Sequence, residues 1–337
     1  MKNFKQIRLG LVGLGFISQI AHLPELKKNK KVDLVAAAEK NPLLLNKVGK
    51  RFHINNLYKS FNHMIRKEKL DGIIVSVQRG STYQVVKQIL KRKIPVLSEK
   101  PAALNLSDAK NLVKISSNLK SLYYIAYMKI HDEGVKFVKN FIIKKKFGNL
   151  RSVYYTNFSG ESYFGNDKYF KQSSNYIKRY SLNKQNLVGE KLFQKFLNSN
   201  CHSINLLRYF FPDLKLNMNE LNKKGEGVLY FLNKKINIIF NNKYSKIKKN
   251  WIEEIDFYFE KGIVKLKLPP PLVKNRFSKI SIQNYKKNNV QNVSLKKVRS
   301  FNNQINFFLN QIRKKKLSHH CSGKNSLADI KIIRNLF

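Results

Sequence analysis

A glycine-rich turn between an apolar strand and a helix constrains the fold of this chain more than any other feature. The turn follows the apolar run 7–12 and leads into a segment with a helical pattern that continues to Leu26. A residue without a Cβ lets the backbone approach a pyrophosphate, whose charge then lies against the free N–H groups of the helix N-terminus. Ser18 replaces the third glycine of the usual pattern and is still small. The residues of the turn that we expect to contact a dinucleotide are Gly13, Gly15, Phe16 and Ile17.

An acidic residue stands where a dinucleotide-binding fold needs one. The run 32–38 predicts the second strand, and Glu39 follows it directly. A carboxylate at this place accepts hydrogen bonds from the adenosine ribose hydroxyls and repels a 2′-phosphate. The sequence therefore predicts NAD as the cofactor. NADP stays open as the alternative, because Lys40 comes next and has the charge to hold a phosphate.

The first part of the chain alternates strand and helix patterns, as a doubly wound parallel sheet requires. Further strands are expected at 55–58, 72–77, 94–97 and 122–126, with helices at 41–52, 60–67, 82–91 and 107–119. In such sheets ligands lie beyond the carboxyl ends of the strands. We therefore expect Gln78 and Ser81, which follow one strand, to line the same crevice as Ser98-Glu99-Lys100-Pro101, which follows the next.

The pattern changes near Tyr127, which predicts a second domain. A helix is expected at 133–143 and a period-two strand at 150–158, with later strands at 227–231, 236–240, 252–260 and 263–268. Asn233-Lys234 and Lys261-Gly262 suit tight turns between strands. Residues 160–190 show no clear period and are interpreted as a loop. The prediction is an α/β protein with a Rossmann domain over 1–126 and an α+β domain over 127–337 that contains an open, mainly antiparallel sheet.

Length and composition indicate a globular protein. The 337 residues, 42% of them hydrophobic, are enough for two domains with substantial cores. No apolar run approaches the roughly 20 residues that span a bilayer, and the first residues lack a signal-peptide pattern. The two cysteines, Cys201 and Cys321, provide no disulfide framework. We therefore expect a cytoplasmic protein without a membrane partner.

The chain is strongly basic, with 66 Lys and Arg against 20 Asp and Glu and a formal net charge of +46. Such a surplus attracts nucleic acid, anionic membranes or phosphorylated substrates. The lysines are nevertheless spread over the whole chain, and arginine, which binds phosphate in a bidentate way, is scarce. Abundant Asn and Ile beside the lysines are typical of an AT-rich genome. Since no recognised binding module accompanies the charge, we interpret it as compositional bias and do not expect a nucleic-acid partner.

Taken together, these features resemble the glucose-fructose oxidoreductase, inositol dehydrogenase and MocA group of pyridine-nucleotide oxidoreductases. The resemblance covers essentially the whole chain and includes the glycine turn, Glu39, Glu99-Lys100-Pro101, Ala126-Tyr127-Met128-Lys129, the helix around His202, and the segments 251–268, 307–312 and 321–324. It implies a Rossmann domain joined to an open antiparallel sheet, with a sugar-type substrate held between the sheet and the nicotinamide. It also implies a homo-oligomer formed through the open sheet.

Lys100 is the first catalytic candidate. Oxidation of an alcohol to a ketone requires a hydride to leave for nicotinamide while a positioned group takes the hydroxyl proton. Lys100 matches the lysine of the family's Glu-Lys-Pro motif, and its cation is suited to hold the hydroxyl and stabilise a developing alkoxide. Glu99 is expected to fix that lysine or to contact the cofactor. An ordinary surface lysine is the alternative, although solvated lysines are not usually placed directly after a buried strand.

His202 is the second catalytic candidate, in a segment with the pattern of an amphipathic helix. In the family a histidine at this place is the usual proton carrier, a task that suits a side chain whose pKa is near neutrality. The family commonly has aspartates four residues before and three residues after this histidine, where this chain has Asn198 and Asn205. These changes remove charge that raises the basicity of the histidine. Some members that act on sugar nucleotides also have Asn at the earlier place, so Asn198 is a candidate substrate contact, and a structural role for His202 stays open.

Other polar clusters carry less weight. His319-His320-Cys321 has metal-binding residue types, but adjacent residues rarely share one metal and no distant partner is apparent, so no metal is expected. His131-Asp132-Glu133 begins a helix, where acids complement the helix dipole. Because the family places substrate contacts near this segment, Lys129 and Tyr154 are further candidates for substrate binding.

The sequence thus predicts an NAD(H)-dependent dehydrogenase or reductase that acts on a secondary alcohol of a sugar, sugar nucleotide or cyclitol, with Lys100 and His202 as the catalytic pair. Two alternatives stay open. A catalytically silent sensor that binds NAD is compatible with the two missing aspartates. A nucleic-acid binder would instead use the basic surface.

Overall fold

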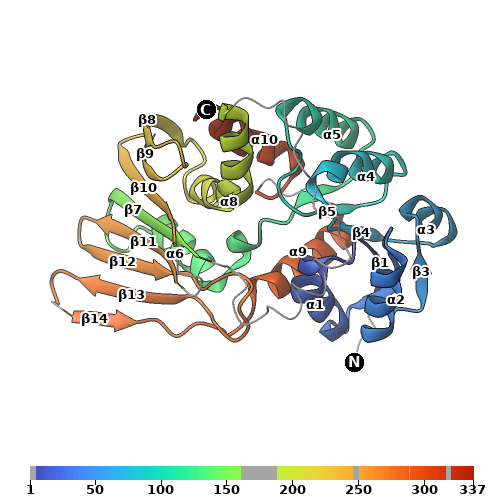
Figure 1. Ribbon diagram of the computed structural model, residues 1–337. Helices are drawn as coiled ribbons and strands as arrows, with labels where there is room; N and C mark the ends of the chain where they lie inside the picture. The colour runs from blue at the N-terminus through green and yellow to red at the C-terminus, as the bar shows by residue number, and fades with distance from the viewer. Residues whose placement is uncertain (1–4, 161–187, 246–249, 288, 316–319) are drawn as a thin grey trace. The chain divides into compact units, whose positions relative to one another are not determined.

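Two compact units make up the described part of the chain. The computed structural model describes residues 5–160, 188–245, 250–287, 289–315 and 320–337 (Figure 1). The first unit consists of residues 5–127 together with the later segments 304–315 and 320–331, and the second consists of the other described residues. The chain therefore leaves the first unit near Tyr127 and returns to it within helix α9 (Ser300–Lys314). No helix in the described ranges has the length and apolar character needed to cross a bilayer.

The first unit contains a six-stranded parallel sheet in the order β3-β2-β1-β4-β5-β6. Its strands are β1 Ile7–Val12, β2 Val32–Ala38, β3 Asn56–Tyr58, β4 Gly72–Val75, β5 Val96–Ser98 and β6 Tyr123–Ile125. Every residue of β4, β5 and β6 is buried, as in sheets that helices cover on both faces. The strand order changes direction between β1 and β4, which is the place where doubly wound sheets bind ligands.

Helices follow the strands in alternation. They are the π-helical turn η1 Ser18–His22, α1 Leu23–Lys28, α2 Pro42–Arg51, α3 Phe61–Lys67, α4 Arg79–Lys91 and α5 Leu106–Asn118. Asn side chains cap two of these helices, because a short amide oxygen accepts hydrogen bonds from the first free N–H groups. Asn41 accepts from Leu43 N at 3.0 Å at the start of α2, and Asn105 accepts from Asp108 N at 2.8 Å at the start of α5.

Part of the core of the first unit comes from the C-terminal end of the chain. Tyr124 in β6 makes edge-to-face contacts with Phe307 and Phe308 of α9, with ring centroids 5.6 and 6.1 Å apart. At the start of β4, a Cβ on Gly72 would lie 2.7 Å from Cδ1 of Ile312, so α9 approaches the strand closely. The hydroxyl of Ser326, in α10 (Gly323–Arg334), lies 3.0 Å from that of Tyr127. The C-terminal segment therefore completes this unit.

The second unit is built on an eight-stranded sheet in the order β14-β13-β12-β11-β7-β10-β9-β8. Its strands are β7 Leu150–Ser159, β8 Lys215–Leu221, β9 Gly227–Asn233, β10 Ile236–Tyr244, β11 Trp251–Phe259, β12 Gly262–Lys267, β13 Lys279–Asn284 and β14 Asn289–Asn292. All neighbouring pairs are antiparallel except β7 and β10, which run parallel. The sheet is therefore open and mainly antiparallel.

One face of this sheet is covered by α6 (Glu133–Ile143) and α8 (Val188–Phe210). Alternate residues of β11 show the two faces: Glu253, Ile255, Phe257 and Phe259 are buried, whereas the residues between them are half-exposed. Phe257 packs against Phe210 of α8, and Phe259 packs against Phe141 of α6. The opposite face, which we call the open face, carries Tyr154 with 47% of its surface exposed.

The predicted fold class is confirmed, since the structure has a parallel six-stranded sheet and a second, mainly antiparallel one. The strands expected from apolar runs are all present within a few residues. Three strands of the second sheet were not predicted: β8, β13 and β14. Helix α8 begins at Val188, inside the segment 160–190 that was interpreted as a loop, and residues 161–187 of that prediction lie outside the described residues.

Candidate functional site

The glycine turn after β1 is held in a fixed shape by its own backbone. Gly13 has a φ of +89°, and a Cβ there would lie 2.2 Å from the carbonyl oxygen of Ser76. Its N–H donates to Ala38 O at 2.8 Å, and its carbonyl accepts from the Ser18 hydroxyl at 2.6 Å. The turn therefore packs directly on the ends of β2 and β4. Only glycine combines this φ with this close approach.

Glu39 closes the same turn from the end of β2. One carboxylate oxygen accepts a hydrogen bond from Leu14 N at 2.9 Å, and the other accepts from Asn41 N at 3.0 Å. A carboxylate offers about four lone-pair sites, so each oxygen can still accept from a ligand hydroxyl. Glu39 thus holds the turn and remains an acceptor.

A cavity of about 270 Å³ lies at the carboxyl ends of β1, β2 and β4. It brings together five of the predicted cofactor residues, namely Gly13, Gly15, Glu39, Gln78 and Ser81. Phe16 and Ile17 follow in the same turn and are half-buried. Two lysines, Lys40 and Lys59, also line the cavity and place positive charge beside Glu39.

Glu99 and Lys100 follow β5, the next strand of the same sheet. One oxygen of Glu99 lies 2.8 Å from Nε2 of His22, whose side chain is fully buried at the end of η1. The other oxygen accepts from the backbone N–H of Lys100 at 3.3 Å. Glu99 therefore fixes the backbone from which Lys100 projects. Lys100 itself is half-buried.

His202 lies on α8 in the second unit, whereas Lys100 lies in the first. Asn198, His202 and Asn205 share one side of α8, because residues four and three apart stack along a helix. Asn205 is buried, and His202 and Asn198 are half-buried. Ser203, also buried, is rotated away from this side and reaches the sheet.

Lys129 and Tyr154 lie on opposite faces of the second sheet. Lys129 is buried and forms an ion pair with Glu253 on the helix-covered face. Tyr154 lies on the open face, where its ring meets that of Tyr258 edge-on at 5.4 Å. The next residue, Tyr155, points to the helix-covered face instead and donates its hydroxyl to Glu253.

A buried polar cluster around Glu253 was missed by sequence reasoning. Its members are Lys129, Glu253, Tyr155 and Ser203, with 3.0 Å between the Tyr155 and Ser203 hydroxyl oxygens. Burial, followed by the charge of Glu253, raises the pKa of Tyr155 well above its ordinary value. One sequence signal was available. Glu253 lies at an alternate position of β11 whose other members, Ile255, Phe257 and Phe259, are apolar. A charged side chain on the buried face of a strand needs an ion-pair or hydrogen-bond partner.

Comparisons with known proteins agree with this geometry. A model of the oxidoreductase family with an NAD-binding Rossmann fold matches residues 7–127. Over these residues, the chain is similar to the glucose-fructose oxidoreductase, inositol dehydrogenase and MocA family. The expected resemblance is thereby confirmed, and so is the NAD-binding class of the first unit.

Two relatives show the extent of the sequence similarity to this family. The rhizopine catabolism protein MocA of Rhizobium meliloti is 24% identical over 148 residues, which are 44% of this chain and 46% of the relative. Myo-inositol 2-dehydrogenase of Thermotoga maritima is 24% identical over 133 residues, which are 40% of each chain. The chain thus aligns with less than half the length of either relative.

Solved structures extend the fold similarity to both units. An oxidoreductase from Agrobacterium radiobacter, in complex with NAD+, L-tartaric acid and magnesium, has a TM-score of 0.73 at 16% identity and covers 98% of this chain and 94% of its own. A 3-ketoreductase from Actinomadura kijaniata, in complex with NADP and TDP-benzene, has a TM-score of 0.73 at 14% identity, with 98% and 96% coverage. The fold similarity therefore extends beyond residues 7–127.

A second polar layer lies beside Glu253 on the helix-covered face. Asn157 of β7 donates to the side-chain oxygens of Asn200 and Asn242, both at 3.1 Å. Asn200 in turn donates to the Tyr244 hydroxyl at 3.1 Å. These amides link α8 to β7 and β10, so the helix that carries His202 is anchored to the sheet by hydrogen bonds as well as by apolar packing.

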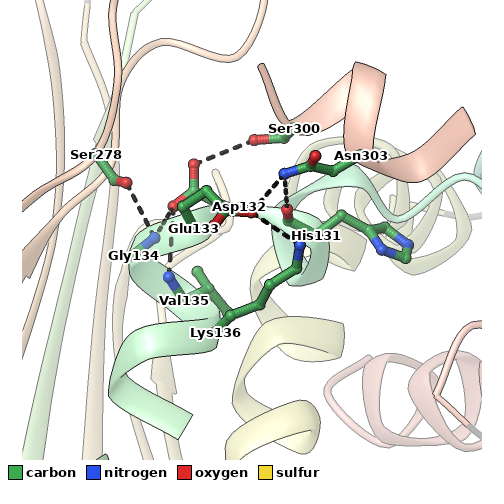
Figure 2. Close-up of polar contacts among 9 residues, drawn as sticks. All are labelled: His131, Asp132, Glu133, Gly134, Val135, Lys136, Ser278, Ser300 and Asn303. Atoms are coloured by element: carbon green, nitrogen blue, oxygen red, sulfur yellow. Dashed lines mark hydrogen bonds and ion pairs between the residues drawn. The ribbon is translucent and has the colours of Figure 1, made fainter. Parts of the chain in front are cut away.

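The start of α6 forms a third polar cluster in the second unit (Figure 2). Asp132 caps the helix and accepts hydrogen bonds from Gly134 N at 2.8 Å and from the Ser300 hydroxyl at 3.2 Å. Asn303 donates to His131 O at 3.0 Å and to Glu133 at 2.8 Å. The cluster therefore joins the start of α6 to the start of α9.

Burial shifts the acid–base properties of this third cluster. It raises the pKa of the Asp132 carboxyl above the ordinary value of 3.8, although hydrogen bonds from Ser278, Gly134, Val135 and Ser300 oppose the shift. Burial, assisted by the charge of Lys136, lowers the pKa of His131 to about 3. His131 is therefore neutral near pH 7 and contributes no charge to the site.

The histidines and cysteines of the sequence do not gather in the described ranges. No group of three His, Cys, Asp or Glu side chains suited to a metal is found among the residues that the structure describes. Cys201 and Cys321 are both buried free thiols, and burial raises the pKa of Cys321. His319 lies outside the described residues.

Proposed function

We propose that this chain is an NAD(P)-dependent oxidoreductase that transfers a hydride between nicotinamide and a secondary alcohol of a sugar, sugar nucleotide or cyclitol. The observation that carries the proposal is the cavity at the strand ends, which gathers Gly13, Gly15, Glu39, Gln78 and Ser81. The relatives in this family include a named myo-inositol 2-dehydrogenase, which supports a polyol-type substrate.

The residues of the first unit suit a dinucleotide. Gly13 has no side chain to block the approach of a pyrophosphate, and Glu39 keeps free acceptor capacity for ribose hydroxyls. We therefore propose NAD as the preferred cofactor. Lys40 and Lys59 in the same cavity wall have the charge to accept a 2′-phosphate, so NADP is the secondary choice. When bound, the nicotinamide supplies the hydride acceptor of the reaction.

The proposed catalytic residues are Lys100 and His202. Lys100 holds the substrate hydroxyl and stabilises the negative charge that develops on its oxygen, while Glu99, anchored by His22, fixes the lysine backbone. His202 takes the hydroxyl proton, a role that an imidazole side chain often performs. The carbon then loses its hydride and becomes a ketone, so one C–H and one O–H bond break and a C=O bond forms. Asn198, on the same side of α8, is a proposed substrate contact.

Binding and turnover assays test this proposal separately. Calorimetry should show NADH binding by the wild type, and NADH absorbance should report turnover with a panel of polyols and sugars. Lys100→Met and His202→Asn should each lower kcat by at least about 100-fold with little change in NADH affinity, in line with general acid–base contributions. Absence of NADH binding would overturn the proposal. Binding without turnover on any polyol would instead favour the silent sensor.

We further propose that the open face of the second sheet forms a homo-oligomer in the cytoplasm. Met218, Leu232 and Tyr154 have 46%, 38% and 47% of their surfaces exposed, and all three lie on this sheet. The register places Tyr154 beside Ile239, and Ile239 beside Tyr230. Large apolar and aromatic side chains gathered on one sheet face favour contact with another protein surface. Two buried free thiols are compatible with a reducing compartment.

A further inference from the structure

Two buried polar atoms on the helix-covered face of β11 have no hydrogen-bond partner among the described residues. They are Oε2 of Glu253, an acceptor, and Nε1 of Trp251, a donor. The Glu253 side chain is fully buried. Because residues two apart in a strand point to the same face, these atoms lie on neighbouring side chains. Buried polar groups are nearly always paired, so this donor and this acceptor are available to a bound molecule.

Lys129 connects the two side chains. Its ammonium group forms an ion pair with the other carboxylate oxygen of Glu253 and lies 6.0 Å from the centre of the Trp251 ring. The Tyr155 hydroxyl also donates to that oxygen. The charge of Glu253 is thus balanced, and one of its oxygens is already occupied. What remains for a ligand is one acceptor, one donor and the flat face of an indole.

Space for a ligand lies next to Trp251. Trp251 lines a groove of about 780 Å³ at the ends of β11, β12 and β13, within the roughly 300–1,000 Å³ usual for small-molecule sites. Lys129 lines a smaller cavity of about 30 Å³. The groove and the small cavity share Leu268, Pro269, Pro270, Arg276 and Phe277 as walls. The groove therefore reaches Trp251, and the small cavity behind the shared walls reaches Lys129.

We propose that Trp251, Glu253 and Lys129 form a hydroxyl-binding site that takes two neighbouring hydroxyl groups of an uncharged sugar or cyclitol ring. One hydroxyl accepts a hydrogen bond from the indole N–H, and its neighbour donates to Oε2 of Glu253. The ring packs on the indole face, where Lys129 already lies close. Because Glu253 neutralises Lys129, the site selects a neutral polyol over an acidic sugar. This inference rests on the proposed function and assigns its substrate contacts.

Tryptophan fluorescence tests the site directly, since Trp251 is the only tryptophan of the chain. The full-length protein is titrated with myo-inositol and D-glucose, and with cyclohexanol as a ligand that has one hydroxyl. A saturable change in emission with a polyol, and none with cyclohexanol, is the expected result. No saturable change with either polyol, or an equal change with cyclohexanol, overturns the inference. The readout needs neither cofactor nor turnover.

Variants separate this site from the proposed function. Trp251→Phe keeps a ring but removes the N–H, and Glu253→Gln removes the charge; we expect polyol affinity measured by calorimetry to fall about tenfold in each. NADH affinity should stay within about twofold, because the dinucleotide cavity lies in the other unit. Tyr258→Phe, on the opposite face of β11, is the matched control and should leave both affinities unchanged.

The outcomes are distinguishable. If Trp251→Phe and Glu253→Gln turn over a polyol with an unchanged KM, the proposed hydroxyl-binding site is overturned. The proposed oxidoreductase function is then retained. If the wild type does not bind NADH but still shows the fluorescence change with a polyol, the proposed oxidoreductase function is overturned. The proposal of a hydroxyl-binding site is then retained. Should Glu253→Gln fail to fold because it leaves Lys129 buried beside a neutral amide, Trp251→Phe carries the test alone, since its ring packing is kept.

Discussion

The polar cluster at the start of α6 predicts a specific loss of stability when Asp132 is replaced by alanine. The substitution removes the helix cap, which is worth about 1 kcal/mol. It also removes the hydrogen bonds from the hydroxyls of Ser300 and Ser278, at about 1 kcal/mol each when the donors lose their partner. Gly134 N keeps a partner, because it also lies 3.2 Å from the Ser278 hydroxyl. Relief of the buried carboxyl offsets part of this loss, so the net cost is about 2–3 kcal/mol.

Urea and thermal unfolding measure this effect through Trp251, which belongs to the same unit as Asp132. At about 2–4 °C for each kcal/mol, the melting temperature of the second unit should fall by about 5–10 °C. Asp213→Ala, at an exposed turn position, is the matched control and should change stability by less than about 0.5 kcal/mol. A loss below about 0.5 kcal/mol for Asp132→Ala would show that the cluster does not hold the start of α6.

The pH dependence gives an independent check of the same cluster. Since burial raises the folded pKa of Asp132, the folded protein keeps a proton that the unfolded chain has already lost. The contribution of Asp132 is therefore complete below its ordinary pKa of 3.8 and is lost as the pH rises through the raised value. Asp132→Asn cannot titrate but retains the cap. The free energy of unfolding of the wild type minus that of Asp132→Asn should fall as the pH rises above 3.8, and a difference that increases would refute the assigned shift.

Three further predictions concern the dinucleotide turn and the open face. Gly13→Ala should abolish NADH binding in calorimetry, because the added Cβ would lie 2.2 Å from Ser76 O and distort the turn. An unchanged NADH affinity would contradict the close approach of the turn to β4. Glu39→Ala should shift the ratio of NADPH to NADH affinity toward NADPH by about tenfold or more, because it leaves Lys40 and Lys59 without an opposing charge; an unchanged ratio would remove Glu39 from the choice of cofactor. Tyr154→Lys should reduce the oligomer to smaller species in light scattering without changing the KM for a polyol, whereas a raised KM at unchanged mass would assign Tyr154 to the substrate instead.

Much of the first unit could be predicted from sequence because its signals are local. The run Gly72–Val75 is continuous and apolar, as expected of a strand buried on both faces, and the glycine turn and Glu39 occupy adjacent strand ends. Parallel topology then brings Gly13, Glu39 and Ser81 to one edge of the sheet. The contribution of Phe308 and Ile312 to this unit carries no such local signal, since their helix could cover any apolar surface.

The second unit was harder to predict because several of its strands have no face of buried apolar residues. All four residues of β14 are exposed, and β8 has no buried residue, so neither shows alternation between faces. In β11 buried apolar and half-exposed residues alternate clearly, but one buried position holds Glu253. Its ion-pair partner, Lys129, lies more than a hundred residues earlier in the chain. A pairing over that distance is set by the fold, and the sequence shows only that a partner is needed.

The parallel pairing of β7 with β10 has a consequence for how the second unit assembles. Strands β8 to β10 pair in chain order, and so do β11 to β14. Each of these groups can therefore form by pairing strands that are close in sequence. Strand β7 is made first yet lies between the two groups, and its partners in β10 and β11 are distant in sequence. Strand β7 therefore joins the two groups into one sheet, and a substitution that disrupts β7 should separate them.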